Sequence, residues 1–343
     1  SGPAGARRVL GDPAADIALL ETARGGILLR GLACQSFDVS VLTNVTADHL
    51  GLHGIHTVEG LAKVKSVVIR VTRPGGWAVL NADDPLVRGA AAATHASRFW
   101  FSRDPANPHV LADLNDGGRA MLAADGWITE ASGSARGDAR TPILPIAEVP
   151  ITFGGRALHM VENALAAAAA LRALGLSPEQ VAAGLRDFGS DPAHNPGRND
   201  LYRVNGGTVL IDYAHNEAGV LHMWDLARSF VEPGGKLTGV VGSAGDRTDE
   251  IIRALGRIAA EKADEVLIKE TQRYLRGRES NDPINLLFIE GFREAGKDPL
   301  AIIETEGDAL RWAIARMHPG DVVAVMCFED PPGTRAIAAS LAG

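Results

Sequence analysis

The stretch Val209-Leu210-Ile211-Asp212-Tyr213-Ala214-His215-Asn216 decides the fold class. A short β-branched apolar run, typical of a buried strand, ends there in an acidic residue and is followed by polar side chains. The same change occurs where Leu19-Leu20 meets Glu21 and where Val39 to Leu42 meets Thr43-Asn44. In an open α/β sheet, ligands bind outside the carboxyl ends of parallel strands. The pattern therefore predicts an α/β protein with its functional side chains at strand ends.

Length and composition narrow the class of protein. A chain of 343 residues exceeds one ordinary core and predicts two domains. The formal charge of -8 argues against a general nucleic-acid binder, because phosphate contacts need clustered Lys and Arg. Small molecules or a polar polymer remain open as ligands.

The cysteines, the apolar stretches and the start of the sequence bear on the cellular compartment of the protein. The only cysteines, Cys34 and Cys327, are too few for a disulfide framework or a zinc cluster and predict free thiols in a cytoplasmic protein. No stretch approaches the roughly 18 consecutive apolar residues of a membrane helix, so no membrane partner is expected. The start, Ser1-Gly2-Pro3, resembles no signal peptide and lacks an initiator Met, which suggests a fragment.

The first part of the chain alternates strands and helices. Residues 16–20, 39–42 and 77–80 are predicted buried strands, and 57–72 a helix with apolar residues on one face. From about 110 to 151, Gly and Asp punctuation predicts an antiparallel excursion. Helices are then expected over 160–174 and 178–188. The first domain is predicted to cover residues 1–190.

A segment rich in turn formers, residues 191–197, is predicted to be the interdomain linker. The second domain, residues 198–343, is predicted to be a doubly wound α/β domain. Its expected strands are 208–211, 237–241, 265–268, 301–304 and 322–326, and two of its helices are expected over 249–262 and 308–317.

Single polar residues are weak signals. Glu21, between an apolar run and Gly25-Gly26, suits Mg²⁺, which prefers one or two carboxylates with phosphate oxygens and water. A lone carboxylate is more often a surface or capping group, and a lone histidine such as His49 is more often structural. Both readings of Glu21 and of His49 stay open from the residues alone.

Several motifs in order resemble the Mur ligases. They are Glu21, the run Thr43-Asn44-Val45-Thr46-Ala47-Asp48-His49-Leu50, Lys65, Asn81-Ala82-Asp83-Asp84, Asn163, Gly197-Arg198 and Asp212 to Asn216. Within this superfamily the chain is most similar to the carboxy-terminal, Mur-like half of cyanophycin synthetases, through Glu21-Thr22-Ala23-Arg24-Gly25-Gly26 and Gly242-Ser243-Ala244-Gly245-Asp246-Arg247. The resemblance implies a Mur-ligase-like central α/β domain followed by a C-terminal Rossmann-like α/β domain.

The resemblance also implies an activity. Such enzymes are ATP-dependent acid-amino acid ligases that phosphorylate a carboxylate and let an amine attack the acyl phosphate, so cations must handle most of the charge. By similarity, Glu21 and His49 would each hold one Mg²⁺, and Lys65 would be a lysine that is carbamylated in many relatives and supports the second metal. The alternatives for Lys65 are a solvated helix lysine or a role taken by Lys63.

The resemblance implies two further groups of site residues. Asn163, Arg198, Asp212, His215 and Asn216 would contact ATP, although Met160 stands where many relatives have asparagine, and Arg198 has a linker salt bridge as its alternative. Gly245, Asp246, Arg247, Arg276 and Arg278 would bind the incoming amino acid, since guanidinium groups bind carboxylates. A plain βα loop and a solvated basic loop are the competing readings.

One family motif is missing. Mur ligases carry a Gly-x-x-Gly-Lys-Thr type P-loop, and no such motif occurs in this sequence. We therefore expect an N-terminal region with a P-loop, and with an ATP-grasp domain ahead of it, in the full-length protein. Two hypotheses follow. The protein is an amide ligase that joins an amino acid such as Arg to an aspartate side-chain carboxylate of a peptide or polymer, with a homo-oligomer as the default assembly. Alternatively, it is a noncatalytic or partial module that binds nucleotide or peptide beside a partner with the P-loop.

Overall fold

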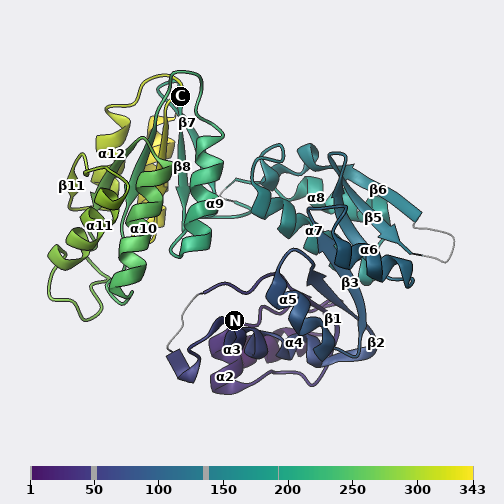
Figure 1. Cartoon of the computed structure of the whole chain (residues 1–343). Coiled ribbons are helices and arrows are strands. Elements are labelled where there is room, and N and C mark those ends of the chain that lie inside the picture. The colour runs from purple at the N-terminus through teal and green to yellow at the C-terminus, as the bar shows by residue number, and fades with distance from the viewer. Residues whose placement is uncertain (1, 48–51, 134–138, 192, 343) are drawn as a thin grey trace. The chain divides into compact units, whose positions relative to one another are not determined.

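The computed structural model describes residues 2–47, 52–133, 139–191 and 193–342. The chain divides into two compact units, Ser1–Asp187 and Phe188–Gly343. Each unit is built on its own six-stranded sheet (Figure 1). Within the described part of the chain, no helix combines the length and the apolar composition needed to cross a membrane.

The sheet of the first unit has the order β1-β2-β3-β4-β5-β6. Strands β1 to β4 are parallel to one another, β5 is antiparallel to β4, and β6 is antiparallel to β5. The strands are β1 (Phe37–Leu42), β2 (Thr72–Asn81), β3 (Ser97–Ser102), β4 (Arg119–Ala124), β5 (Trp127–Ser132) and β6 (Ala139–Pro145). The mixed sheet confirms the α/β class and the antiparallel excursion.

Helices cover both faces of this sheet. They are α1 (Pro3–Leu10), α2 (Arg24–Arg30), α3 (Val58–Lys65), α4 (Val67–Arg70), α5 (Pro85–Ala90), α6 (Pro108–Asn115), α7 (Leu158–Ala173) and α8 (Pro178–Asp187). The Ala-rich helix α7 packs on β1 to β4, while α4 and α5 contact β1 and β2. Small alanine side chains let α7 approach the sheet closely, and Ala164, Ala168 and Ala169 are almost completely buried.

Two predictions for this unit need correction. The helix expected over 57–72 is divided at Ser66 into α3 and α4, and Thr72 already begins β2. Residues 16–20 do not form a strand, and Leu19 is 93% exposed. A strand needs a partner for its backbone groups. The nearest sheet edge is β1, and a cavity of about 690 Å³ is lined both by residues 18–24 and by β1.

The sheet of the second unit has the order β11-β10-β9-β12-β8-β7. All its neighbours are parallel except β7 and β8. The strands are β7 (Asp200–Val204), β8 (Gly207–Asp212), β9 (Leu237–Val241), β10 (Glu265–Lys269), β11 (Ile302–Ile303) and β12 (Val322–Met326). The carboxyl ends of β8, β9, β10 and β12 therefore meet at one edge.

The helices of this unit are α9 (Glu217–Arg228), α10 (Asp249–Lys262), α11 (Asp282–Glu294), α12 (Glu306–Ile314) and α13 (Pro331–Leu341). Helices α9, α10 and α11 pack on one another in sequence, and α12 packs on α13 (Figure 1). The predicted strands 237–241 and 322–326 and the predicted helix 249–262 have the bounds found for β9, β12 and α10. The doubly wound architecture is confirmed.

Candidate active site

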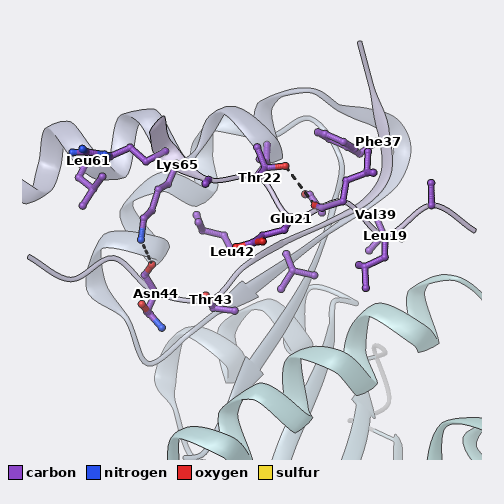
Figure 2. Close-up of a pocket in the computed structure, with 17 residues that line it drawn as sticks. Leu19, Glu21, Thr22, Phe37, Val39, Leu42, Thr43, Asn44, Leu61 and Lys65 are labelled. Atoms are coloured by element: carbon purple, nitrogen blue, oxygen red, sulfur yellow. Dashed lines mark hydrogen bonds between the residues drawn. The ribbon is translucent and has the colours of Figure 1, made fainter. Parts of the chain in front are cut away.

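A cavity that runs along β1 to the loop after its carboxyl end gathers the predicted catalytic residues of the first unit that the structure describes. Its volume is about 690 Å³, and Glu21, Thr43, Asn44 and Lys65 all line it (Figure 2). Glu21 lies in the extended segment that precedes α2, and Thr43 and Asn44 follow β1 directly. The cavity therefore brings together a carboxylate, a hydroxyl, an amide and an ammonium group from three separate segments of the chain.

The position of Lys65 on α3 separates it from Lys63. The Lys65 Nζ donates to the carbonyl oxygen of Asn44 at 3.3 Å, and this bond ties the end of α3 to the loop after β1 (Figure 2). Lys63, two residues earlier, lines a different cavity that is bordered by α3, α4 and α5. Residues two positions apart on an α-helix point about 200° apart around the helix axis, so the side chains of Lys63 and Lys65 face different cavities.

The loop after β1 is held by the Asn81-Ala82-Asp83-Asp84 motif. One carboxylate oxygen of Asp84 accepts the backbone N–H of Val45 at 2.8 Å. The other oxygen accepts the N–H groups of Leu86 and Val87 and caps α5. Asp84 thus fixes the loop that carries Thr43 and Asn44. This positioning role of the motif was not predicted from the sequence.

Asp83 and Glu162 form a second acidic group near the ends of β2 and β3. Asp83 accepts the Ser102 hydroxyl at 2.5 Å and the Arg103 N–H at 2.8 Å. The Arg103 side chain pairs with Glu162 of α7 at 2.7 Å. Burial raises the pKa of Glu162, Arg103 opposes this rise, and the charges of Asp83 and Asp84 add to it. Glu162 directly precedes the predicted ATP contact Asn163, and the sequence analysis missed it.

Two predicted residues of this unit have a different status. His49 lies outside the described residues, so its predicted metal contact is untested. Asn163 is exposed on α7, and its amide lies 3.6 Å from the Met160 sulfur. In the described ranges, no group of three or more His, Cys, Asp or Glu side chains is arranged to hold a metal ion. The predicted trio of Glu21, His49 and Lys65 is not tested by this finding, because His49 lies outside the described residues.

In the second unit, Asp212 anchors a tight turn. Its carboxylate, at the end of β8, is 7% exposed and accepts the N–H of Asn199 at 2.8 Å. The Tyr213 N–H donates to the Gly197 carbonyl at 3.1 Å. The turn 197–199 is therefore hydrogen-bonded to the Asp212 side chain and to the backbone of the next residue. Burial raises the pKa of Asp212 to about 6, against the lowering effect of the Asn199 hydrogen bond and of Arg198.

The turn presents side chains at the strand end. Arg198 is exposed, and its guanidinium lies 5.6 Å from the centroid of the Tyr213 ring. A ring nitrogen of His215 lies 3.0 Å from the Tyr213 carbonyl oxygen. Asn216 accepts the N–H of Gly219 at 2.9 Å and caps α9. The structure therefore gives the Asn216 side chain a capping contact, whereas Arg198, Tyr213 and His215 cluster at the strand end.

The five predicted amino-acid-binding residues lie in two adjoining loops. The loop after β9 contains Gly245, Asp246 and Arg247, and the loop after β10 contains Arg276 and Arg278. Arg276 pairs with Asp246 at 2.6 Å. Arg278 donates to the carbonyl oxygens of Gly245 and Arg247 at 3.0 and 3.2 Å.

The two arginines of these loops differ in their freedom. Arg278 also pairs with Asp249 at 2.7 Å, and its side chain is only 18% exposed. The Arg276 side chain is 51% exposed, and surface pairs of this kind hold weakly. We infer that Arg278 braces the two loops, whereas the guanidinium of Arg276 can exchange Asp246 for another carboxylate.

Comparisons with known proteins assign the family. The model of the Mur ligase middle domain matches residues 8–171, and that of the Mur ligase glutamate ligase domain matches residues 197–327. The chain belongs to the Mur ligase family. The recognition made from the motifs is confirmed, and so is the predicted Mur-ligase-like fold of both units.

Individual relatives extend this assignment. The chain is 39% identical over 327 residues to the cyanophycin synthetase of Synechocystis sp., a match that covers 95% of this chain and 36% of that protein. It is 31% identical to the UDP-N-acetylmuramoyl-L-alanyl-D-glutamate--2,6-diaminopimelate ligase of Gloeobacter violaceus, over 72% of this chain and 45% of the relative. This Mur ligase chain thus spans about a third of the length of the cyanophycin synthetases it matches.

A solved structure shares the fold. E. coli FolC in complex with ADP, without folate substrate, matches with a TM-score of 0.59 and 19% identity. The match covers 88% of this chain and 62% of FolC. At that identity the likeness concerns the fold alone.

Proposed function

We propose that the protein is an ATP-dependent amide ligase that activates a carboxylate as an acyl phosphate. In the first step the substrate carboxylate attacks the terminal phosphorus of ATP and ADP leaves. In the second step an amine attacks the acyl carbon, and phosphate leaves from the tetrahedral intermediate. The family membership and the ligase names of the relatives support this class of reaction.

The observation that carries the proposal is the shared cavity of Glu21, Asn44 and Lys65. These residues come from three different segments, and Lys65, not Lys63, faces the cavity. The reaction develops negative charge on phosphate and acyl oxygens, so a site for it needs cationic and hydrogen-bonding groups at one strand end. This cavity meets that requirement.

The donor groups of the cavity fit Mg²⁺. Hard cations take oxygen ligands, and Glu21 supplies a carboxylate, Thr43 a hydroxyl and Asn44 an amide oxygen at the same cavity. We propose Glu21 as the protein ligand of one Mg²⁺ and His49 as a ligand of a second. The ion, when bound, supplies charge neutralisation for the phosphates. Glu21 would hold such an ion at the cavity, together with the side-chain oxygen atoms of Thr43 and Asn44.

Lys65 is proposed as the site of a carbamate. Its half-buried amine lies in the cavity and is held by the Asn44 carbonyl at 3.3 Å. An amine must lose its proton before it attacks CO₂, and partial desolvation favours the uncharged amine. The new N–C bond would convert a positive side chain into a negative one next to Glu21. Such a group would add an oxygen ligand for metal.

Nucleotide binding is proposed for the clustered residues of the second unit, together with Asn163 of the first. The carboxylate of Asp212 is fixed by the Asn199 N–H at a strand end, where hydroxyl groups of a ribose can donate to it. Arg198 and His215 lie beside Tyr213, so a phosphate or an adenine ring would find a guanidinium and aromatic faces there. The FolC neighbour, which is described in complex with ADP, supports this assignment.

The triphosphate cradle is proposed to come from polypeptide outside this chain. The sequence has no Gly-x-x-Gly-Lys-Thr motif, and the cyanophycin synthetase relatives are almost three times as long. Strand β1 ends the sheet, and Leu19, which lines the cavity beside it, is 93% exposed. An unpaired edge beside an exposed apolar side chain suits an added parallel strand. A P-loop that followed such a strand would end near Glu21 and Lys65.

The substrates are proposed by analogy with the relatives. The exposed guanidinium of Arg276 would grip the carboxylate of an incoming amino acid such as arginine, and the acceptor would be an aspartate side-chain carboxylate in a peptide or polymer. Gly245, Asp246 and Arg247 would border the amine, with Arg278 as the brace between the loops.

The test uses the full-length protein with ATP, Mg²⁺, an aspartate-containing peptide and L-arginine. We expect ADP release that requires both the peptide and the amine, with one new amide bond for each ADP. ADP release that requires neither addition would indicate ATP hydrolysis without ligation, and nucleotide binding without any ADP release would favour the noncatalytic module.

A further inference from the structure

A buried ion pair in the second unit is not used by the proposed chemistry. Lys269 ends β10 and Glu306 begins α12, and their residues are 1% and 3% exposed. The ammonium and the carboxylate are in direct contact, and the Lys269 Nζ also lies 3.5 Å from the centroid of the Phe328 ring. Buried pairs are costly to desolvate, so the pair calls for an explanation other than stability alone.

Glu306 organises the loop that follows β12. Its carboxylate accepts three consecutive backbone N–H groups, from Phe328 at 3.1 Å, Glu329 at 3.3 Å and Asp330 at 3.2 Å. The Cys327 thiol and the Thr334 hydroxyl donate to it as well, at 2.9 and 3.1 Å. A single carboxylate thus fixes the backbone from the end of β12 to the start of α13.

Glu329 connects the loop after β12 to the loop after β10. One of its oxygens accepts the N–H groups of Gln272 and Arg273, each at 2.6 Å. These residues begin the loop after β10 that leads to Arg276 and Arg278. Glu329 is only 9% exposed as a residue, so water competes little for these bonds.

The loop after β10 in turn holds the loop after β9. The Tyr274 carbonyl accepts the Gly245 N–H at 2.8 Å. A Cβ at Gly245 would lie 1.9 Å from the Leu275 carbonyl oxygen, so the backbones of residues 245 and 275 pack directly against each other with no room for a side chain. Any shift of residues 272–275 must therefore move Gly245.

We propose that Glu329, held in place by Glu306, is a positioning residue that sets the loops carrying Gly245, Arg276 and Arg278 for the incoming amine. The inference rests on the proposed amide ligase function. It assigns the buried ion pair a task at the amine site, because the pair orders the loop from which Glu329 reaches residues 272 and 273. Ordering these loops before binding removes an entropy cost from amine capture.

The kinetic test compares Glu329→Ala with Glu329→Gln in the full-length protein, with L-arginine as the amine. A glutamine keeps one acceptor oxygen for the two N–H groups, whereas alanine keeps none. We expect Glu329→Ala to raise the KM for L-arginine about tenfold, the size of one or two lost hydrogen bonds, with the KM for ATP unchanged. Glu329→Gln should restore most of the loss. Equal KM values for L-arginine in Glu329→Ala and the wild type would overturn the proposal.

A second measurement needs no turnover, so it separates this proposal from the proposed function. Hydrogen exchange at the Gly245 amide should accelerate in Glu329→Ala and return towards the wild-type rate in Glu329→Gln. Glu290→Ala, which removes the carboxylate of a surface pair with Arg253, serves as the matched control and should leave Gly245 unchanged. If the wild type released no ADP with any amine, the proposed function would fail, and unchanged Gly245 exchange in Glu329→Ala would still overturn the positioning role.

Discussion

The charged side chains at the carboxyl edges of the two sheets have different surroundings. In the first unit, the end of β1 opens into a cavity where Glu21 and Lys65 face free volume. In the second unit, Lys269 is paired with Glu306 and Arg278 with Asp249. Ion pairs hold the loops around them in place, whereas side chains that line a cavity can contact a ligand there. We assign the chemistry to the first edge and the positioning of substrates to the second.

The largest effect is expected from breaking the buried pair. Glu306→Ala leaves the Lys269 ammonium buried without its carboxylate, and we expect a loss of about 3–5 kcal/mol in the free energy of unfolding. Urea denaturation of the purified protein measures it. The double variant Lys269→Met/Glu306→Leu should recover only part of this loss, because the backbone N–H groups of the loop after β12 still lack an acceptor. A loss below about 1 kcal/mol in Glu306→Ala would mean that this edge is not held by its charges.

The pH dependence of Asp212 comes next. Its pKa is raised from 3.8 to about 6, so the folded state binds the proton more tightly than the unfolded state does. Stability from this group is therefore present below pH 3.8 and is lost as the pH rises to about 6, by about 3 kcal/mol in total. Asp212→Asn removes the titration. The unfolding free energy of the wild type minus that of Asp212→Asn should fall between pH 4 and pH 6, and a flat difference would refute the shift.

Glu21→Gln sharpens the contrast because it changes the open edge. The structure gives Glu21 an exposed position at the cavity, so we expect a change in unfolding free energy within about 0.5 kcal/mol. Amine-dependent ADP release should fall on the order of 100-fold. Glu59→Gln is the control, because Glu59 is a carboxylate on α3 that lines the other cavity. Equal losses of activity in both variants would remove Glu21 from the site.

Arg276→Ala is expected to have only a small effect on stability. The pair of Arg276 with Asp246 is about half exposed on both sides, so its loss should cost no more than about 1 kcal/mol. The same variant should raise the KM for the amine, because Arg276 is the proposed contact with its carboxylate. An unfolding midpoint shifted as far as that of Glu306→Ala would show that Arg276 is a structural brace like Arg278.

Much of the fold could be predicted from local pattern. Strand β12 is a continuous apolar run, β9 is mostly apolar with Thr238 inside it, and α10 starts after the capping residue Thr248, so their bounds were visible in the sequence. The segment 16–20 has the composition of a strand, yet strand formation also depends on a neighbour that local pattern does not reveal. β7, which has the same length as β9 and β12, was missed because the charged residues Asp200 and Arg203 interrupt its apolar pattern.

The sequence indicated which residues line the cavity better than it indicated their contacts. The motif order singled out Glu21 and Lys65, but a role for Lys63 stayed open until the structure placed the two lysines at different cavities. The partners of these groups depend on tertiary packing. The contact of Lys269 with Glu306 joins residues 37 positions apart, and neither residue stands in a motif that the sequence analysis quoted. Such pairs become visible only once the strands and helices are in place.

Lys65→Ala and Lys63→Ala, compared in the full-length protein, test the central claim most directly. The two lysines lie on one helix and differ in the cavity they line. The account predicts that Lys65→Ala lowers amine-dependent ADP release on the order of 100-fold and that Lys63→Ala keeps wild-type activity, with both proteins folded. Full activity in Lys65→Ala, or equal losses in the two variants, would contradict it.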